Sequence, residues 1–270
     1  MTERQQREAE FHDQWAKEIE IEAIDPAIAF TAKTAIETQF ILQDITKSLG
    51  PLESLTVLDM GCGAGESAVY FAKQGARVLA TDISPGFIHC AHALAAHHQV
   101  QIDARVCASE AMPFEENGCD VVFANGVLHH VDIPPTMKEV QRLLRVGGKG
   151  YFIEPLPYNP VINVYRYMAR EVRTVDEKPL TLADVQSIRD LFPKTTVHYF
   201  WLTTLVVFLY FFLIERAHPG KVRYWKKVLY DADKYQWFFQ PLAQLDAFLF
   251  RCLPPIGLLC WTMVISVEKE

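Results

Sequence analysis

The sequence lacks any lysine- and arginine-rich run, and its excess charge is negative. It contains 26 Lys and Arg against 33 Asp and Glu, for a net charge of -7. Proteins that bind the phosphate backbone of nucleic acids concentrate positive charge on one face. The sequence therefore disfavours nucleic acid as a partner.

The cysteines lack the spacing of a disulfide framework or a zinc site. The six cysteines are Cys62, Cys90, Cys107, Cys119, Cys252 and Cys260. They include no Cys-x-x-Cys pair, and no histidine lies at metal-ligand spacing from them. Thiols in this pattern are typical of a reducing compartment. The first residues, MTERQQREAEFHDQW, also lack the apolar stretch of a signal peptide. We therefore expect a cytoplasmic protein with no bound metal.

No apolar run reaches the about 20 residues that a membrane-spanning helix needs. The run WLTTLVVFLYFFLI (Trp201 to Ile214) is shorter, and a basic and aromatic segment from Lys221 to Lys227 follows it. Two interpretations stay open. The run is a buried core helix, or it is an apolar lid whose basic-aromatic flank lies at a membrane surface.

What is present is an alternation of short β-branched runs and helical patterns between Thr56 and Glu154. This alternation predicts a parallel sheet with right-handed crossovers. Two helices are expected before it, one ending before Pro26 and one reaching Leu49, and a Gly147-Gly148 turn is expected to end a later helix. The predicted organisation is a helical cap (1–50), a main domain (51–201 and 256–270) and a helical insertion (202–255).

A glycine-rich turn follows the first predicted strand. VLDMGCGAG (Val57 to Gly65) places Asp59 at the strand end and glycines at the entry to a helix. Such a turn brings backbone amides and a helix N-terminus close to a ligand. A tight turn that serves only packing remains the alternative.

The second predicted strand ends in Asp82. In a nucleotide-binding unit, an acidic residue at this position lies beside the ribose hydroxyls. The alternative role is that of an N-cap for the next helix.

Four segments in order, VLDMGCGAG, ATDIS, EAMPFEENGCDVVFANGVLHHV and RLLRVGGKG, resemble the motifs of the class I S-adenosylmethionine-dependent methyltransferases. Within that family they are most similar to the group that contains the ubiquinone and menaquinone methylases. The resemblance implies S-adenosyl-L-methionine as cofactor. It also implies a doubly wound, Rossmann-like α/β fold with seven strands, the last of them antiparallel.

The resemblance also implies roles for individual residues. Asp59 lies near the methionine amine, and Asp82 binds the ribose hydroxyls. The other implied cofactor-binding positions are Gly61, Cys62, Gly63, Gly65, Ile83 against the adenine, Ser109, Glu110 and Asn125. One departure is Ala108, where relatives carry an aspartate that accepts a hydrogen bond from the adenine amine, so Ser109 or backbone groups are expected to replace it.

Methyl transfer needs alignment of nucleophile, methyl group and sulfur, and a base only if the nucleophile must lose a proton. The candidates at the carboxyl ends of the strands are His130, His129 and Glu154, although a histidine there also serves as a cap or packs in the core. A polar, aromatic stretch follows Glu154. Its side chains are predicted either to line a substrate pocket or to lie on a solvated helix. The candidate substrate-binding residues are Tyr158, Tyr165, Arg166 and Arg170.

The apolar insertion would cover this edge of the sheet, which favours methylation of oxygen or carbon on a small lipophilic acceptor such as a quinone, prenyl, lipid or polyketide-like compound. Methylation of a polar metabolite, for example at a sugar hydroxyl, is the alternative within the class. A non-catalytic binding module and a dinucleotide-dependent oxidoreductase are the rivals outside it. The intact Asp59, Gly61, Gly63 and Asp82 count against the first, and the incomplete GxGxxG spacing counts against the second.

Overall fold

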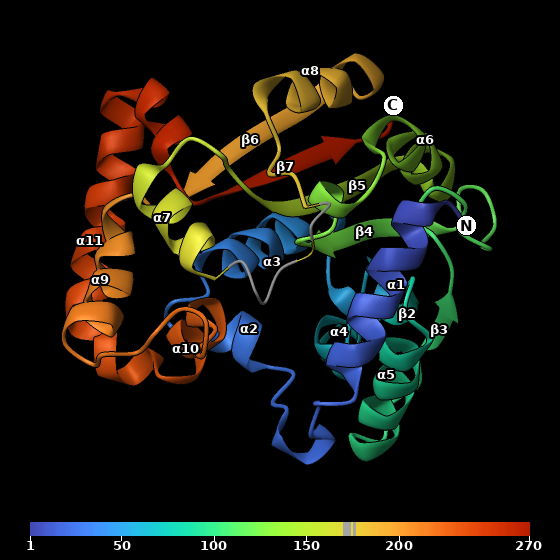
Figure 1. The fold of residues 1–270 in the computed structure, drawn as a ribbon. Coiled ribbons are helices and arrows are strands. Elements are labelled where there is room, and N and C mark those ends of the chain that lie inside the picture. The colour runs from blue at the N-terminus through green and yellow to red at the C-terminus, as the bar shows by residue number, and fades with distance from the viewer. Residues whose placement is uncertain (170–173, 175–176) are drawn as a thin grey trace.

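The computed structural model describes residues 1–169, 174 and 177–270, which surround a seven-stranded sheet (Figure 1). The strand order is β3-β2-β1-β4-β5-β7-β6, and β7 runs antiparallel to both β5 and β6 while the other pairs are parallel. The strands are β1 Thr56–Met60, β2 Arg77–Asp82, β3 Asp103–Val106, β4 Cys119–Asn125, β5 Leu144–Pro155, β6 Lys194–Phe200 and β7 Thr262–Glu268. The predicted fold class is confirmed.

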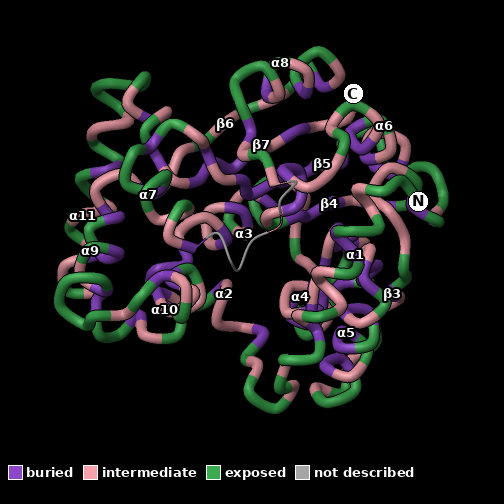
Figure 2. Tube along the Cα trace, viewed as in Figure 1, coloured by how far each residue is buried: buried purple, intermediate pink, exposed green. Residues whose placement is uncertain are grey.

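Helices cover both faces of the sheet, and the buried residues follow the strands (Figure 2). Apolar side chains of α3, α4 and α5 pack on one face, and those of α6 and α8 pack on the other. The helices are α1 Glu3–Ala16, α2 Ile28–Thr31, α3 Ile36–Leu49, α4 Glu66–Lys73, α5 Pro85–His97, α6 Ile133–Leu143, α7 Pro160–Met168, α8 Leu182–Leu191, α9 Val206–Leu213, α10 Tyr224–Tyr230 and α11 Ala232–Cys252. The strand order reverses between β1 and β4, where doubly wound sheets form a ligand crevice at their carboxyl edge.

The first N-terminal helix ends at Ala16, before Pro26 as predicted, and the helix that reaches Leu49 is α3. One local expectation differs from the structure. Gly147-Gly148 was predicted to end a helix. Helix α6 already ends at Leu143, and both glycines lie within β5, with Gly147 at φ +77°. The register shift between β4 and β5 at Cys119 and Val121 accounts for this, because a β-bulge accommodates a left-handed glycine.

Helix α1 lies over the carboxyl edge of the sheet against α5 (Figure 1). Its Asp13 carboxylate accepts hydrogen bonds from Ser84 Oγ (2.5 Å) and from the Gly86 amide (2.9 Å). A Cβ at Gly86 would come within 2.9 Å of Ala16 Cβ, so only glycine allows this close approach. The C-terminal end of α1 is therefore held on the N-terminus of α5.

The segment between β6 and β7 has a core of its own. Phe208 and Phe211 of α9 are buried among Trp201, Tyr224 and Phe239. The buried Asp246 of α11 ties this core to the end of β6, because its carboxylate accepts hydrogen bonds from the amides and hydroxyls of residues 202–204. Within the described residues, no helix combines the length and the apolar character that crossing a membrane requires.

Candidate active site

A cavity of about 470 Å³ runs along the carboxyl edge of the sheet. One part is lined by the turn after β1 and the ends of β2 and β4. Another part is lined by α7, α10 and the residues before β7, and side chains of α1 also line the cavity. The elements that the sequence analysis placed at this edge therefore surround a single space.

The three glycines of the first turn have different structural roles. Gly63 (φ +53°) lines the cavity, and a Cβ there would meet nothing within 4 Å. A Cβ at Gly61 would lie 2.5 Å from Val127 Cγ2, and one at Gly65 would lie 2.8 Å from Ala91 Cα. Gly65 is thus required for packing against α5 and does not line the cavity, whereas Gly63 leaves room for a ligand beside the backbone.

Asp59 and Asp82 place two buried carboxyl groups beside this turn. Burial raises the pKa of Asp59 to about 8, and the nearby carboxyls of Asp82 and Glu66 add to the rise. Its buried Oδ2 atom has no hydrogen-bond partner among the described residues. An acid in this environment favours a cationic ligand group, because a positive charge compensates both its burial and its neighbours.

The carboxylate of Asp82 is oriented by two backbone amides. Its Oδ2 accepts from Gly63 N and its Oδ1 accepts from Ser84 N, both at 2.9 Å. Each carboxylate oxygen can accept two hydrogen bonds, so acceptor capacity remains for ligand hydroxyls. The N-cap of α5 is Ser84, whose Oγ accepts from Phe87 N, and not Asp82.

The remaining predicted cofactor residues mostly lie on the same wall. Cys62, Ile83, Ser109, Glu110 and Asn125 all line the cavity. Glu110 is also contacted from α1, since Gln5 Nε2 donates to its Oε2 at 3.1 Å. Helix α1 therefore covers the region that the resemblance gives to the adenine.

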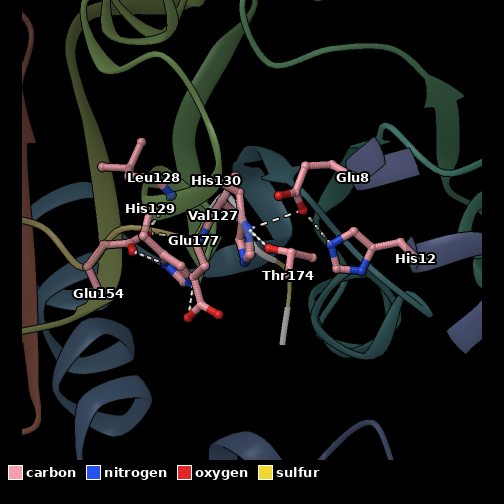
Figure 3. Close-up of polar contacts among 9 residues, drawn as sticks. All are labelled: Glu8, His12, Val127, Leu128, His129, His130, Glu154, Thr174 and Glu177. Carbon is pink, nitrogen blue, oxygen red and sulfur yellow. Dashed lines mark hydrogen bonds and ion pairs between the residues drawn. The ribbon is translucent and has the colours of Figure 1, made fainter. Parts of the chain in front are cut away.

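Glu154 and His129 form a buried pair after β5 and β4 (Figure 3). Glu154 Oε1 accepts from the amides of residues 127 and 128, at 2.9 and 2.7 Å, and its Oε2 lies 2.6 Å from His129 Nδ1. The other ring nitrogen of His129 lies 3.2 Å from Glu177 Oε1. Burial opposes the positive charge of this ring, but the two carboxylates raise the pKa of His129 to about 9. The ring is therefore a cation at neutral pH, which is not the state of a general base.

His130 has a different environment. Its Nδ1 faces Glu8 Oε2 at 3.2 Å and Thr174 Oγ1 at 3.4 Å. Burial lowers the pKa of His130, although Glu8 acts in the opposite direction. Glu8 also faces His12 Nε2 at 3.5 Å, so α1 adds a carboxylate and an imidazole to the site (Figure 3).

The far part of the cavity is mainly aromatic and aliphatic. Of the residues predicted to bind substrate, Tyr165 and Arg166 line it. Tyr158 does not, because its hydroxyl accepts a hydrogen bond from the Leu182 amide at the start of α8. Arg170 lies outside the described residues. The apolar lining here comprises Trp15, Ile162, Trp201, Trp225, Val228 and Trp261.

Three cations of the expected basic flank have partners within the protein, whereas Lys221 is exposed. Lys226 Nζ lies 3.6 Å from Glu66 Oε1, and Lys227 Nζ pairs with Glu215 at 2.8 Å and with Asp231 at 2.7 Å. Arg223 lies over the ring of Trp15, 3.6 Å from its centroid. These cations therefore join α10 to α1, α4 and the rest of the insertion.

Sequence reasoning predicted residues 1–50 as a helical cap but named none of the α1 side chains that line the cavity. Glu8, His12 and Trp15 line the cavity and are spaced four and three residues apart, which places them on one helix face. That spacing could have indicated a functional helix face, because a carboxylate, an imidazole and an indole side chain lie together on it. Glu37 and Glu177 were missed as well, and their roles depend on contacts with β7 and with His129.

Comparisons with known proteins agree with this geometry. Residues 58–152 match the family model described as "Methyltransferase domain". A ubiquinone biosynthesis O-methyltransferase of Methylocella silvestris is 41% identical over 99 residues, covering 36% of this chain and 39% of the relative. A demethylmenaquinone methyltransferase of Chlorobaculum parvum is 38% identical over 109 residues, covering 39% and 44%. The chain thus spans less than half the length of these two relatives.

Among solved structures, geranyl diphosphate C-methyltransferase from Streptomyces coelicolor A3(2) aligns with a TM-score of 0.59 at 16% identity. The alignment covers 100% of this chain and 99% of that one. At this identity the likeness concerns the fold. The match to the methyltransferase model over residues 58–152 agrees with the resemblance that the motifs indicated.

Proposed function

We propose that this chain, which contains a methyltransferase domain, transfers a methyl group from S-adenosyl-L-methionine to oxygen or carbon of a small lipophilic acceptor. The observation that carries the proposal is the continuity of the cavity. Its acidic, glycine-lined part meets an aromatic part without an intervening wall. A methyl donor in the first part would face an acceptor in the second.

The residues of the acidic part fit the cofactor. The unpartnered carboxyl of Asp59 suits the methionine ammonium, and the oriented carboxylate of Asp82 suits two ribose hydroxyls. The open space at Gly63 allows the ligand to approach the backbone. In this proposal Ile83, Ser109 and Glu110 hold the adenine, and Asn125 lies beside the methionine part.

The cofactor supplies an electrophilic methyl group on a sulfonium, and the protein aligns the acceptor with it and excludes water. Glu154 is proposed as a positioning residue, since it holds the backbone after β4 and the ring of His129 together. His130 is the side chain of the pair proposed to face the acceptor. Tyr165 and Arg166 are proposed to contact the acceptor from α7.

In this proposal each of the three regions predicted from the sequence has a role in catalysis. Residues 51–201 and 256–270 form the catalytic domain, residues 1–50 form a cap, and residues 202–255 form a wall of the acceptor site. The quinone relatives and the prenyl diphosphate enzyme have names that indicate hydrophobic acceptors. The four tryptophans of the cavity support an acceptor of that class in this chain.

The proposal includes a peripheral membrane contact that would deliver such an acceptor. The surface proposed for it is the apolar side of the insertion and not the Lys221–Lys227 flank, whose Lys226 and Lys227 are paired internally. Large apolar side chains are exposed on and beside α9 and α11, namely Leu213 (65%), Ile214 (66%), Trp237 (74%) and Phe248 (61%). Exposed apolar groups of this size are typical of contact surfaces.

Calorimetry with S-adenosylhomocysteine tests the cofactor assignment. Asp82→Ala is expected to weaken binding by roughly 2 to 3 kcal/mol, because it removes charge-assisted bonds to two hydroxyls. Asp103→Ala is the matched control, since Asp103 begins the neighbouring strand and pairs with the exposed Arg105. Absence of binding by the unaltered chain, or equal losses in both variants, would contradict the proposal.

Transfer of labelled methyl groups tests the acceptor class. The unaltered chain is incubated with labelled S-adenosylmethionine and with lipid or polar extracts, and the labelled product is identified by mass spectrometry. We expect label in the lipid extract. Label confined to the polar extract would establish the alternative substrate class.

A further inference from the structure

Three potential metal ligands from two distant segments converge on one side of the cavity. Glu8 and His12 come from α1, and His130 comes from the turn after β4 (Figure 3). One ligand atom from each lies within 4.8 Å of the other two. Glu8 is 3% exposed, so its carboxylate is held away from bulk water.

The distances within this group are long for hydrogen bonds between charged partners. Glu8 Oε2 lies 3.2 Å from His130 Nδ1 and 3.5 Å from His12 Nε2. Charge-assisted hydrogen bonds are usually about 2.7 to 2.9 Å long, and the nearby Glu154 and His129 are 2.6 Å apart. Both buried oxygens of Glu8 lack a hydrogen bond of acceptable geometry within the part of the chain that is described.

The same distances fit a shared ion. Zinc binds imidazole nitrogen and carboxylate oxygen at about 2.0 to 2.2 Å in tetrahedral sites, so neighbouring ligand atoms are about 3.3 to 3.6 Å apart. The separations of 3.2 and 3.5 Å lie close to this range. A buried carboxylate also needs a compensating positive charge, which an ion bound between Glu8 and the two imidazoles would supply.

We infer that Glu8, His12 and His130 bind one divalent transition metal ion. Two imidazoles and one carboxylate suit zinc, cobalt, iron or manganese better than magnesium or calcium, which prefer all-oxygen ligand sets. Three protein ligands leave a coordination position for a fourth group. All three residues line the cavity, so that position is available to a ligand inside it.

Metal binding has a structural consequence that does not depend on methyl transfer. The ion would join α1 directly to the carboxyl end of β4, in addition to the Asp13 contacts with Ser84 and Gly86. It binds the folded chain and not the unfolded one, and it therefore stabilises the cap by mass action.

A second consequence rests on the proposed function and makes His130 a metal ligand instead of a base. A hydroxyl acceptor bound to the ion has a lowered pKa and loses its proton to solvent. The oxygen lone pair then forms the bond to the methyl carbon. The carbon–sulfur bond breaks, and its electron pair remains on sulfur.

The test uses the full chain after treatment with a chelator. Zn²⁺ is titrated by calorimetry, and Co²⁺ is titrated by visible absorption, which reports the coordination geometry. We expect one ion per chain and an increase in Tm. Glu8→Gln and His12→Gln should each weaken Zn²⁺ binding at least tenfold, because each removes one of three ligands. His97→Ala is the matched control, since His97 is an exposed imidazole at the end of α5.

Binding of S-adenosylhomocysteine is measured on the same samples. Its retention in Glu8→Gln shows that the fold and the cofactor site are intact, so failure of the metal site is distinguishable from failure of the proposed function. If Glu8→Gln does not fold, His12→Gln provides the same test. The inference is overturned if no stoichiometric ion binds or if His97→Ala weakens binding equally. It is also overturned if Glu177→Gln removes the ion while Glu8→Gln does not, which would place the ion on the neighbouring group His129, His130 and Glu177.

Discussion

Cofactor binding is expected to release a proton from Asp59. The pKa of Asp59 in the ligand-free chain is raised to about 8 by burial and by the carboxyls of Asp82 on β2 and Glu66 on α4. At pH 7 this group is therefore roughly 90% protonated. An ammonium group placed against it favours the charged carboxylate, so the proton leaves on binding.

The magnitude follows from the ionised fraction. Between pH 6 and pH 7 the ionised fraction of a group with a pKa of about 8 rises roughly tenfold, which equals about 1.4 kcal/mol. The affinity for S-adenosylhomocysteine should rise by the same factor in this interval. Calorimetry at pH 7 in two buffers of different ionisation enthalpy should detect close to one proton released per chain.

Asp59→Asn provides the control, because an amide does not titrate. The variant should bind more weakly, with a flat pH dependence and no proton release from this position. Affinity of the unaltered chain that does not change with pH, together with no proton release, would refute the reasoning. The same result would show that Asp59 is already ionised or does not contact the ligand.

The raised pKa of Asp59 can also be tested through the stability of the ligand-free chain. A carboxyl whose pKa is raised in the folded state stabilises the fold when it is protonated, and this contribution is lost as pH rises from about 4 toward 8. Asp59→Asn should therefore raise the Tm of the ligand-free chain at pH 8 relative to the unaltered chain. S-adenosylhomocysteine at a fixed concentration should stabilise the unaltered chain more than the variant, because the variant binds it more weakly.

Three further predictions concern other parts of the molecule. Ala108→Asp should tighten binding of S-adenosylhomocysteine about fivefold, near 1 kcal/mol, by restoring an acceptor for the adenine amine; unchanged calorimetric affinity would show that Ser109 or backbone groups already serve it. Phe208→Ser should lower the free energy of unfolding in urea by about 3 kcal/mol or more, because the Phe208 side chain is 3% exposed. Trp225→Ala, on the cavity wall, should mainly raise the KM for the acceptor. A Phe208→Ser variant that keeps its stability and has a raised KM would make Phe208 part of the lid. Leu213→Glu should weaken binding to lipid vesicles and leave cofactor affinity unchanged, and vesicle binding equal to that of the unaltered chain would remove this surface from the proposal.

The sequence left the orientation of the insertion's basic segment open. The segment Lys221–Lys227 carries basic and aromatic residues that suit a membrane surface when they are considered alone. In the folded chain Lys226 faces Glu66, and Lys227 faces Glu215 and Asp231. The ion-pair partner of a lysine depends on how the elements pack against one another. The pattern of residues within one segment does not predict that partner.

The sequence by itself determined the fold class and the local features that are proposed to hold the cofactor. The turn after β1 and Asp82 at the end of β2 are local features, since a strand, a glycine turn and a helix are specified by residues next to one another. The tertiary structure alone decided that Gly65 packs on α5, that Tyr158 turns away from the cavity, and that Glu8 and His12 face His130. These contacts join segments that are distant along the chain, and they form only when α1 and the insertion pack on the finished sheet. Their energies depend on burial and on facing charges, which a single segment of sequence does not contain.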